Sequence, residues 1–154
     1  MKIRKIMTRA PAYCTPLCTA EMAANLMYQY DTGILPVVQD SLDLRLVGVV
    51  TDRDLCRSVI AARRDPAHTA VNECMSRNPI SASPEDEVKQ AAELMAEHQL
   101  RRLPVLDEHG HLVGMLSLAD MVEQDAVGME LLAHTLKSIC VPSRLAADKR
   151  TRAA

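Results

Sequence analysis

Aromatic residues are almost absent from this chain: its 154 residues include no tryptophan, no phenylalanine and three tyrosines. A ligand site here therefore does not depend on an aromatic cage, and a nucleic-acid surface does not depend on aromatic side chains that stack on bases. Hydrophobic residues still make up 48% of the sequence, so the chain can bury a substantial core. Aliphatic side chains and the nine methionines must fill that core.

Neither sign of charge dominates, and no long apolar segment is present. The formal net charge is -2, with both signs interspersed, which provides no broad attraction to nucleic acid or to an anionic membrane surface. No apolar run approaches the roughly 20 residues that span a bilayer, and the N-terminal residues lack the pattern of a secretory signal. We therefore expect a cytoplasmic protein that contacts neither a membrane nor nucleic acid.

The cysteines and histidines follow no pattern that indicates a reactive centre. Five cysteines are scattered along the chain without a repeated pair spacing, and we expect reduced, mostly buried thiols. No second pair or histidine cluster completes a metal site around Cys14 and Cys18, so we expect no metal. A disulfide between Cys14 and Cys140 stays open as an alternative. The five histidines are dispersed, which indicates no catalytic residue and no enzyme.

One sequence pattern occurs twice. A Leu-Pro-Val segment begins at Leu35 and again at Leu103, and a Gly-x-x-[Ser/Thr]-x-x-Asp motif begins at Gly48 and again at Gly114. The first pair is separated by 68 residues and the second by 66. One structural unit is therefore duplicated, and its first copy has a hairpin loop two residues longer, a change that a turn tolerates.

Each copy is predicted to contain a short strand, a helix, a β-hairpin and a second helix. Apolar residues at helical spacing place the first helices over residues 19–30 and 83–99. Thr19 is a candidate N-cap, and Ser83, followed by a proline and two acids, is its counterpart in the second copy. The predicted strands are 34–38, 44–50, 103–106 and 111–116, and the second helices begin at Thr51 and Ser117.

The pattern also divides the chain into segments. We expect a first repeat over 1–62, a charged linker over 63–70, a second repeat over 71–126, a C-terminal helix over 127–142 and a polar tail over 143–154. A small sheet with helices on one face leaves its other face apolar, and the second copy can cover it. The predicted fold is therefore α+β, with two β-α-β-β-α repeats packed about a pseudo-two-fold axis.

This duplicated arrangement resembles the cystathionine-β-synthase (CBS) domain pair, or Bateman module. The resemblance covers residues 1–125 and rests on two copies in register of the Leu-Pro-Val strand, the glycine motif and an Ala-Ala helix. It implies a small free-standing module with no catalytic domain and an adenosine-type ligand in the cleft between repeats. It also implies that two modules stack on their apolar helical faces into a disc-like homodimer.

The motif residues suit a nucleoside phosphate on chemical grounds. Its glycine permits close approach of a ligand or of a neighbouring backbone. Thr51 and Ser117 place a hydroxyl and backbone N–H groups at a helix start, which favours a phosphate. Asp54 and Asp120 follow one turn later on the same side, and a carboxylate can accept hydrogen bonds from both hydroxyls of a ribose. Helix capping and dipole compensation remain structural alternatives for these four residues.

The resemblance implies further ligand contacts. Cationic residues would face the phosphates, and the candidates are Arg53, Arg101 and Arg102, because a guanidinium binds phosphate oxygens in a bidentate way. Adenine would lie against the first strand and the Leu-Pro-Val strand of each repeat, where core packing is the competing role. The positions implied are Tyr13, Cys14, Ile34, Leu35 and Pro36 in the first repeat, and Ile80, Ser81, Arg102, Leu103 and Pro104 in the second.

Two functions remain open. The first is a regulatory module that binds AMP, ADP or ATP, with NAD and S-adenosylmethionine as further candidates, and transmits its ligand state to an unknown protein partner. Such a module requires a ligand that binds two conformations unequally, and it requires no other cofactor. The alternative is a stress-associated interaction module whose nucleotide sites are weak or vacant.

Overall fold

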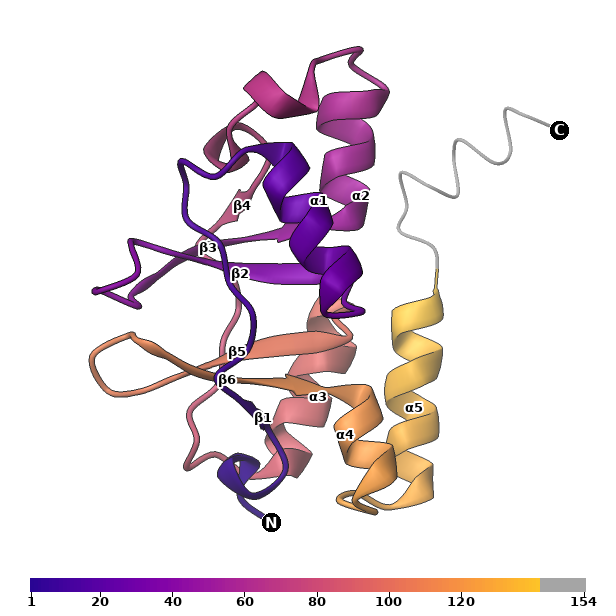
Figure 1. Ribbon diagram of the computed structural model, residues 1–154. Coiled ribbons are helices and arrows are strands. Elements are labelled where there is room, and N and C mark those ends of the chain that lie inside the picture. The colour runs from indigo at the N-terminus through magenta and orange to yellow at the C-terminus, as the bar shows by residue number, and fades with distance from the viewer. Residues whose placement is uncertain (142–154) are drawn as a thin grey trace, which may run out of the picture.

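Two copies of one mixed α/β unit form the structure, a computed structural model that describes residues 1–141 (Figure 1). The strands lie on one side of the molecule and the longer helices on the other. The first copy contains α1 (Ala20–Gln29), β2 (Ile34–Val38), β3 (Leu46–Thr51) and α2 (Asp52–Leu55), which continues as a π-helical segment over Cys56–Ile60. The second contains α3 (Val88–His98), β5 (Arg102–Leu106), β6 (Leu112–Ser117) and α4 (Leu118–Glu123).

The two copies exchange edge strands. The short strand β1 (Thr8–Arg9) lies before α1 in the first repeat but pairs with β6 of the second. Likewise β4 (Ser76–Arg77) lies before α3 in the second repeat but pairs with β3 of the first. The sheets therefore have the orders β1-β6-β5 and β2-β3-β4. Each sheet is completed only by a strand from the other half of the chain, which makes the two repeats one folding unit.

The first strand expected inside each repeat is reduced to a single bridge. Cys14 makes one parallel bridge to Val37, and Ala82 makes one to Val105. The extended pairing instead lies a few residues earlier, in β1 and β4. Between these positions the backbone turns through a positive φ, 47° at Ala10. The corresponding turn in the second copy lies at Asn78, with φ of 50°.

The start of α1 confirms the predicted cap, whereas the start of α3 does not. Thr19 accepts a hydrogen bond from the Met22 N–H at 3.2 Å. Helix α3 begins at Val88 and not near Ser83. The carboxylate of Asp86 accepts from the Ser83 N–H, and the Asp86 carbonyl accepts from the Ile3 N–H. Residues 83–86 therefore form a separate turn whose backbone binds the N-terminal segment.

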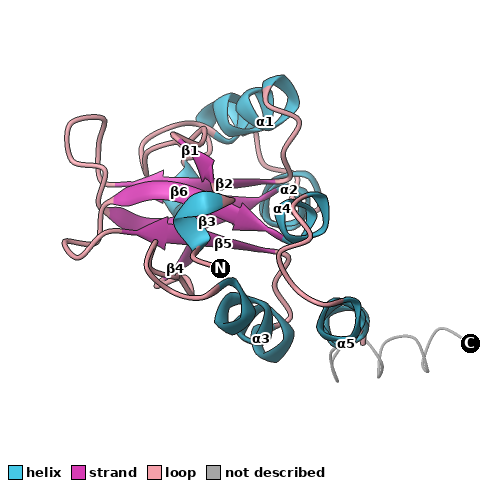
Figure 2. Cartoon of the chain, turned by 90° about the horizontal axis from the view of Figure 1, so that it is seen from below, coloured by secondary structure: helices cyan, strands magenta, loops and turns pink. Residues whose placement is uncertain are grey.

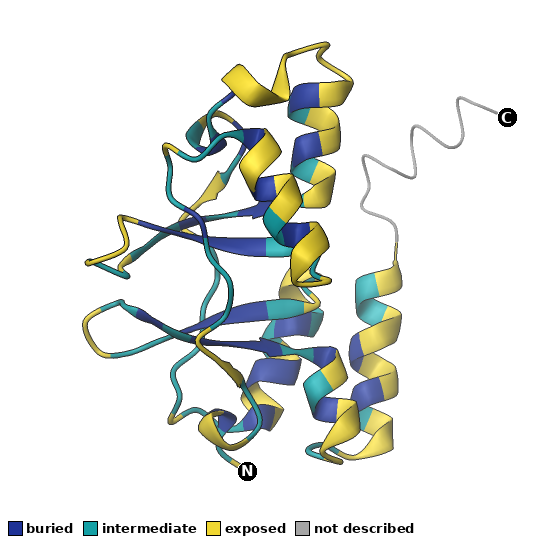
Figure 3. Ribbon diagram, in the orientation of Figure 1, coloured by how far each residue is buried: buried dark blue, intermediate teal, exposed yellow. Residues whose placement is uncertain are grey.

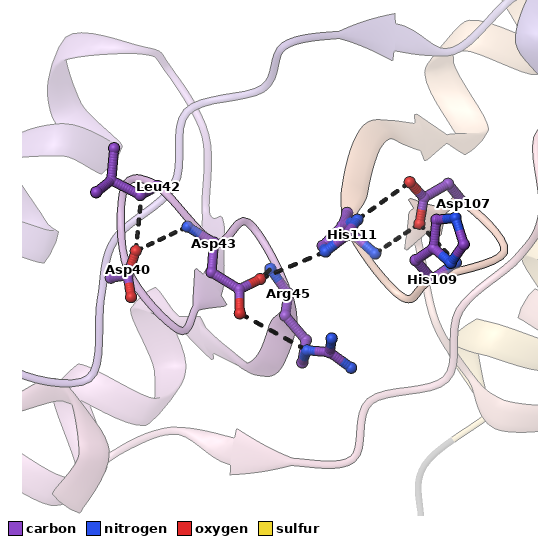
Figure 4. A network of polar contacts seen from close by, with 7 residues as sticks. All are labelled: Asp40, Leu42, Asp43, Arg45, Asp107, His109 and His111. Carbon is purple, nitrogen blue, oxygen red and sulfur yellow. Dashed lines mark hydrogen bonds and ion pairs between the residues drawn. The ribbon is translucent and has the colours of Figure 1, made fainter.

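The hairpin loops of the two copies contact each other. Strands β3 and β6 begin at Leu46 and Leu112, slightly later than predicted, because the preceding residues pair across the copies: the Leu112 N–H donates to the Leu44 carbonyl at 2.9 Å. His111 lies between Asp43 at 3.4 Å and Asp107 at 3.2 Å (Figure 4). Backbone hydrogen bonding by His111 helps to lower the pKa of Asp107 below its ordinary value. The contact ties the longer loop of the first copy to the second.

Each repeat has its own hydrophobic core. Leu35, Val37 and Val50 are fully buried in the first, and Leu103, Val105 and Leu116 in the second. The exchange extends to these cores, because the fully buried Ile3 packs in the second core and the fully buried Val71 packs in the first. None of the described helices is long and apolar enough to cross a membrane.

The expected C-terminal helix is α5 (Met129–Cys140), and it covers only the second repeat. It packs along α3, where the Thr135 hydroxyl faces the Ala92 carbonyl at 3.4 Å. Figure 2 shows α5 beside α3 and apart from α1. One side of α5 is buried and the other exposed (Figure 3). The predicted polar tail, 143–154, lies outside the described residues.

All five cysteines are free, so the structure does not form the alternative Cys14–Cys140 disulfide. Cys14 and Cys74 are buried, whereas Cys56 and Cys140 are exposed. Burial, followed by the charge of Cys18, raises the pKa of the Cys14 thiol to about 12. Burial also raises the pKa of Cys74.

Replacing either motif glycine by alanine should destabilise the fold. A Cβ at Gly48 would lie 2.7 Å from the Ser76 carbonyl oxygen, and one at Gly114 would lie 3.0 Å from the Thr8 carbonyl oxygen. We expect Gly48→Ala and Gly114→Ala each to lower the free energy of unfolding by about 1–3 kcal/mol, because the exchanged strand must move. Urea titration measures this. Gly128→Ser is the control, since a Cβ there meets no atom within 4 Å; equal losses in all three variants would contradict the argument.

Thiol reactivity should separate the cysteines by burial. At pH 8 a thiol reagent reacts with thiolate, which is scarce for a group whose pKa is raised. We expect Cys56 and Cys140 to react with the native protein at least about tenfold faster than Cys14 and Cys74, and all five to react after unfolding. Peptide mapping under nonreducing conditions assigns the labels. A peptide that joins Cys14 to Cys140 would contradict this expectation.

Candidate functional site

Each motif forms a closed capping box at the end of a hairpin. Thr51 Oγ1 donates to Asp54 Oδ2 at 2.7 Å, the Thr51 N–H donates to the same oxygen at 3.0 Å, and the Asp54 N–H donates to Thr51 Oγ1 at 3.1 Å. The second motif repeats this geometry. Asp120 Oδ2 accepts from the Ser117 N–H at 2.7 Å and from Ser117 Oγ at 2.8 Å. The capping role considered from the sequence is therefore realised in both repeats.

These bonds change the chemistry available at the helix starts. The hydroxyl protons of Thr51 and Ser117 are directed to carboxylates, so they do not point at a ligand. The Asp52 N–H is also bound, to the Gly33 carbonyl at 3.0 Å, and the Leu118 N–H to the Arg101 carbonyl at 3.1 Å. The backbone donors expected to bind a phosphate are thus largely occupied by the protein itself.

The carboxylates keep one oxygen available. The side-chain hydrogen bonds of Asp54 and Asp120 all involve Oδ2, and among residues 1–141 neither Oδ1 has a hydrogen-bond partner. Both side chains are partly exposed. Because two bonds to Oδ2 fix the orientation of each carboxylate, Oδ1 is a positioned acceptor.

Two clefts lie between the repeats, and each contains one of these carboxylates. The Asp120 cleft has a volume of about 280 Å³ and combines the second motif with the N-terminal segment and α1–β2 turn of the first repeat. The Asp54 cleft has a volume of about 410 Å³ and combines the first motif with the corresponding segments of the second repeat. The Asp120 cleft is lined by Thr8, Ala10, Pro11, Ala12, Tyr30, Thr32, Ile34, Pro36, Arg102, Met115, Ser117 and Asp120. The Asp54 cleft is lined by Ile34, Val49, Thr51, Asp54, Ser76, Arg77, Asn78, Pro79, Ile80, His98, Leu100, Arg102 and Pro104.

Strand alternation decides which predicted residues reach these clefts. Successive side chains of a strand point to opposite faces, so Ile34 and Pro36 line a cleft while Leu35 between them is fully buried in the core. Leu103 is likewise fully buried, and Cys14 packs in the first core. The predicted residues that line a cleft are Ile34, Pro36, Thr51, Asp54, Ile80, Arg102, Pro104, Ser117 and Asp120.

The remaining predicted residues lie elsewhere. Tyr13 and Ser81 are half-buried but line neither cleft. Arg53 and Arg101 are exposed and line an adjoining cavity, of about 480 Å³, which also includes Ile139 of α5. This cavity shares Ile34, Thr51, Leu100 and Arg102 with the Asp54 cleft. Of the three arginines that the resemblance implied, Arg102 alone lines the clefts.

Several cleft residues were missed by the sequence analysis. The exchanged strands and the turns after them bring Thr8, Ala10, Pro11, Ala12 and Arg77 to the other repeat, and Tyr30 and His98 line clefts from the ends of α1 and α3. A signal for them exists in the sequence. The 68-residue offset relates Thr8–Ala12 to 76–80 and Tyr30 to His98, so a lining position found in one copy indicates one in the other.

No metal centre accompanies the clefts in the described part of the chain. Residues 1–141 contain no group of three or more His, Cys, Asp or Glu side chains placed to hold an ion.

Comparison with known proteins identifies the repeat. The model of the CBS domain family matches residues 3–61 and 71–126. CBS domain-containing protein YhcV of Bacillus subtilis is 39% identical over 119 residues, which cover 77% of this chain and 81% of that protein. Hypoxic response protein 1 of Mycobacterium tuberculosis is 34% identical over 128 residues, 83% of this chain and 86% of that protein.

Solved structures agree. Hypoxic response protein I, crystallised with two coordinated zinc ions, superposes with a TM-score of 0.72 at 31% identity and covers 80% of this chain and 98% of its own. CBSX2 of Arabidopsis thaliana in complex with AMP gives a TM-score of 0.71 at 27% identity and covers 80% of this chain and 95% of its own. With two matched domains, an exchanged-strand fold and these relatives, the chain belongs to the CBS domain family as a tandem CBS pair.

Proposed function

We propose that this CBS pair is a regulatory module that binds an adenosine nucleotide between its repeats and transmits the ligand state to a protein partner. The observation that carries the proposal is the fixed carboxylate in each cleft, with Oδ1 available (distances above). Two adjacent hydroxyls can donate to one carboxylate, so a ribose diol is the fitting ligand group. The AMP complex of CBSX2, at 27% identity, supports an adenine nucleotide.

The walls of the clefts suit a nucleobase. Pro36 and Met115 line the Asp120 cleft, and Pro104 and Val49 line the Asp54 cleft. These apolar side chains can cover the faces of adenine without an aromatic partner. Arg102 supplies a guanidinium for the phosphate, which it can bind with two parallel hydrogen bonds.

Each cleft is built from both repeats, which gives a route from binding to signalling. A ligand held by Asp120 and Pro36 bridges the second motif to the first repeat, and one held by Asp54 and Pro104 bridges in the opposite sense. Ligand contacts of this kind stabilise one relative arrangement of the repeats over others, which is the condition for a population shift. A partner that contacts both repeats can detect that arrangement.

Asparagine at the two carboxylate positions tests the proposal. Asn keeps one oxygen for the capping box but replaces the other with an NH₂ group that cannot accept from ribose. We expect Asp54→Asn/Asp120→Asn to weaken AMP binding about 10–100-fold in calorimetry, the usual range for a lost hydrogen bond to a charged group. Wild-type protein should bind 2′-deoxy-AMP with a similar loss, whereas the variant should not distinguish AMP from 2′-deoxy-AMP.

Asp52→Asn is the matched control, because Asp52 occupies a variable position of the motif and lines neither cleft. Its AMP affinity should equal that of the wild type. Undiminished AMP binding by the double variant would contradict the ribose contact. Absence of AMP binding by the wild type would favour the second candidate function, an interaction module with weak or vacant nucleotide sites. The observation in favour of that candidate is that the backbone donors at the helix starts are already bound within the protein.

A homodimer through the helical side is the assembly that we propose. Helix α5 covers α3, where Ala92 is fully buried, but nothing among residues 1–141 covers the equivalent position on α1, where Ala24 is exposed. An apolar groove of about 240 Å³, lined in part by Ala24, Leu55 and Ile60, is open there. The internal repeat thus indicates what fits this groove: a helix like α5. The outer side of α5, with Leu136 44% exposed, can supply it from a second copy.

In a dimer with a two-fold axis this contact occurs twice, so a single substitution that introduces a charge is present in both contacts and should disrupt both. We expect wild-type protein to sediment as a dimer and both Ile60→Asp and Leu136→Asp to sediment as monomers. Leu42→Asp is the control: Leu42 is 97% exposed and belongs to the loop between β2 and β3. That loop lies on the side of the molecule away from the longer helices (Figure 1). A wild-type mass of one chain across a dilution series, or a dimer in all variants, would contradict the interface.

A further inference from the structure

Arg102 has an unusual position, because it lines both clefts. It begins β5, opposite Ser117 in the register of the second hairpin. The duplicated position in the first repeat is Ile34, which begins β2 opposite Thr51 and also lines both clefts. Two equivalent positions therefore meet between the clefts, but only one carries a charge.

The charges around the two clefts are unequal. In the described part of the chain, Arg102 is the only cationic residue that lines the Asp120 cleft. The Asp54 cleft has Arg102 and, in addition, Arg77 and His98. At the positions equivalent to His98 and Asn78, the Asp120 cleft has Tyr30 and Ala10. The Asp54 cleft is also larger, about 410 Å³ against about 280 Å³.

One guanidinium cannot serve two phosphates equally. Its planar donors bind a single phosphate in a bidentate way, and a second phosphate drawn to the same group meets the negative charge of the first. Arg102 is half-buried and forms no ion pair with residues 1–141, so its charge is available to one cleft or the other. Ile34 provides no substitute.

We infer that Arg102 makes the two clefts compete for anionic nucleotides, so that AMP in the Asp54 cleft weakens a second AMP in the Asp120 cleft at least tenfold. This inference rests on the proposed function. The competition acts through the phosphate, so adenosine, which has no charge, should fill both clefts without it. Each chain then binds one phosphorylated nucleotide tightly, although both clefts have room for a ligand.

Exchange of the two equivalent residues provides the test. Isothermal titration with AMP should show one tight site per wild-type chain and a second site at least tenfold weaker. Ile34→Arg supplies the missing guanidinium, so its two AMP sites should differ by less than about threefold. In Arg102→Ile the Asp120 cleft, which then has no cationic residue in its lining, should bind AMP no more tightly than adenosine. The double variant Ile34→Arg/Arg102→Ile again has one shared arginine and should recover one tight and one weak site.

Single carboxylate variants assign the clefts. Asp54→Asn should weaken AMP in the Asp54 cleft and leave Arg102 to the Asp120 cleft, whose AMP affinity should rise above that of the weak wild-type site. Asp120→Asn should leave the tight site intact. Two equal and independent AMP sites in the wild type, or an unchanged ratio in Ile34→Arg, would overturn the inference while leaving nucleotide binding in place. Failure of the wild type to bind both AMP and adenosine would instead overturn the proposed function. Circular dichroism and urea unfolding verify that each variant is folded.

Discussion

The reciprocal exchange of β1 and β4 is the constraint on which the rest of the structure depends. Gly48 and Gly114 allow it, because in each sheet the incoming backbone passes where a Cβ would lie (contacts given above). After pairing, the chain turns through a positive φ at Ala10 and Asn78 and returns to its own repeat. That return path forms a wall of each cleft. Without the exchange each sheet would keep only the two strands of its own hairpin, and neither cleft would have its second side.

Local patterns in the sequence were sufficient for the duplicated unit, the hairpins and the caps at Thr19, Thr51 and Ser117, since each depends on neighbours within a few residues. The exchange was not predicted because its partners are distant in sequence and β1 and β4 are only two residues long. The start of α3 was predicted at residue 83 instead of Val88 for the same reason, because a segment distant in sequence decides it. Residues 83–86 read as a helix start on local grounds, but their carbonyl groups bind the N-terminal segment.

The candidate site shows a similar division. The motif carboxylates were identified because their spacing alone puts them at a helix start, and the capping geometry follows from that spacing. The family resemblance implied consecutive strand residues, yet the pleat of the strand admits Ile34 and Pro36 to the cleft and directs Leu35 to the core. Among the arginines, Arg102 is the first residue of β5 and lies opposite Ser117, whereas Arg101 lies just before the strand and is exposed. Only the assembled sheet makes that distinction visible.

Duplication alone would give two equal clefts, and the differences between the copies are therefore where regulation can arise. The second repeat has Arg102 where the first has Ile34, and His98 where the first has Tyr30. Helix α5 covers the second repeat but not the first. The first two differences make the clefts unequal toward an anion, and the third makes the outer faces unequal toward a partner. A ligand that clamps the repeats through one cleft thus acts on a molecule with one covered and one open helical face. On the opposite side, the hairpin loops of the two repeats are joined through His111. The open α1 face is accordingly the surface through which we expect a change between the repeats to reach a second copy or another protein.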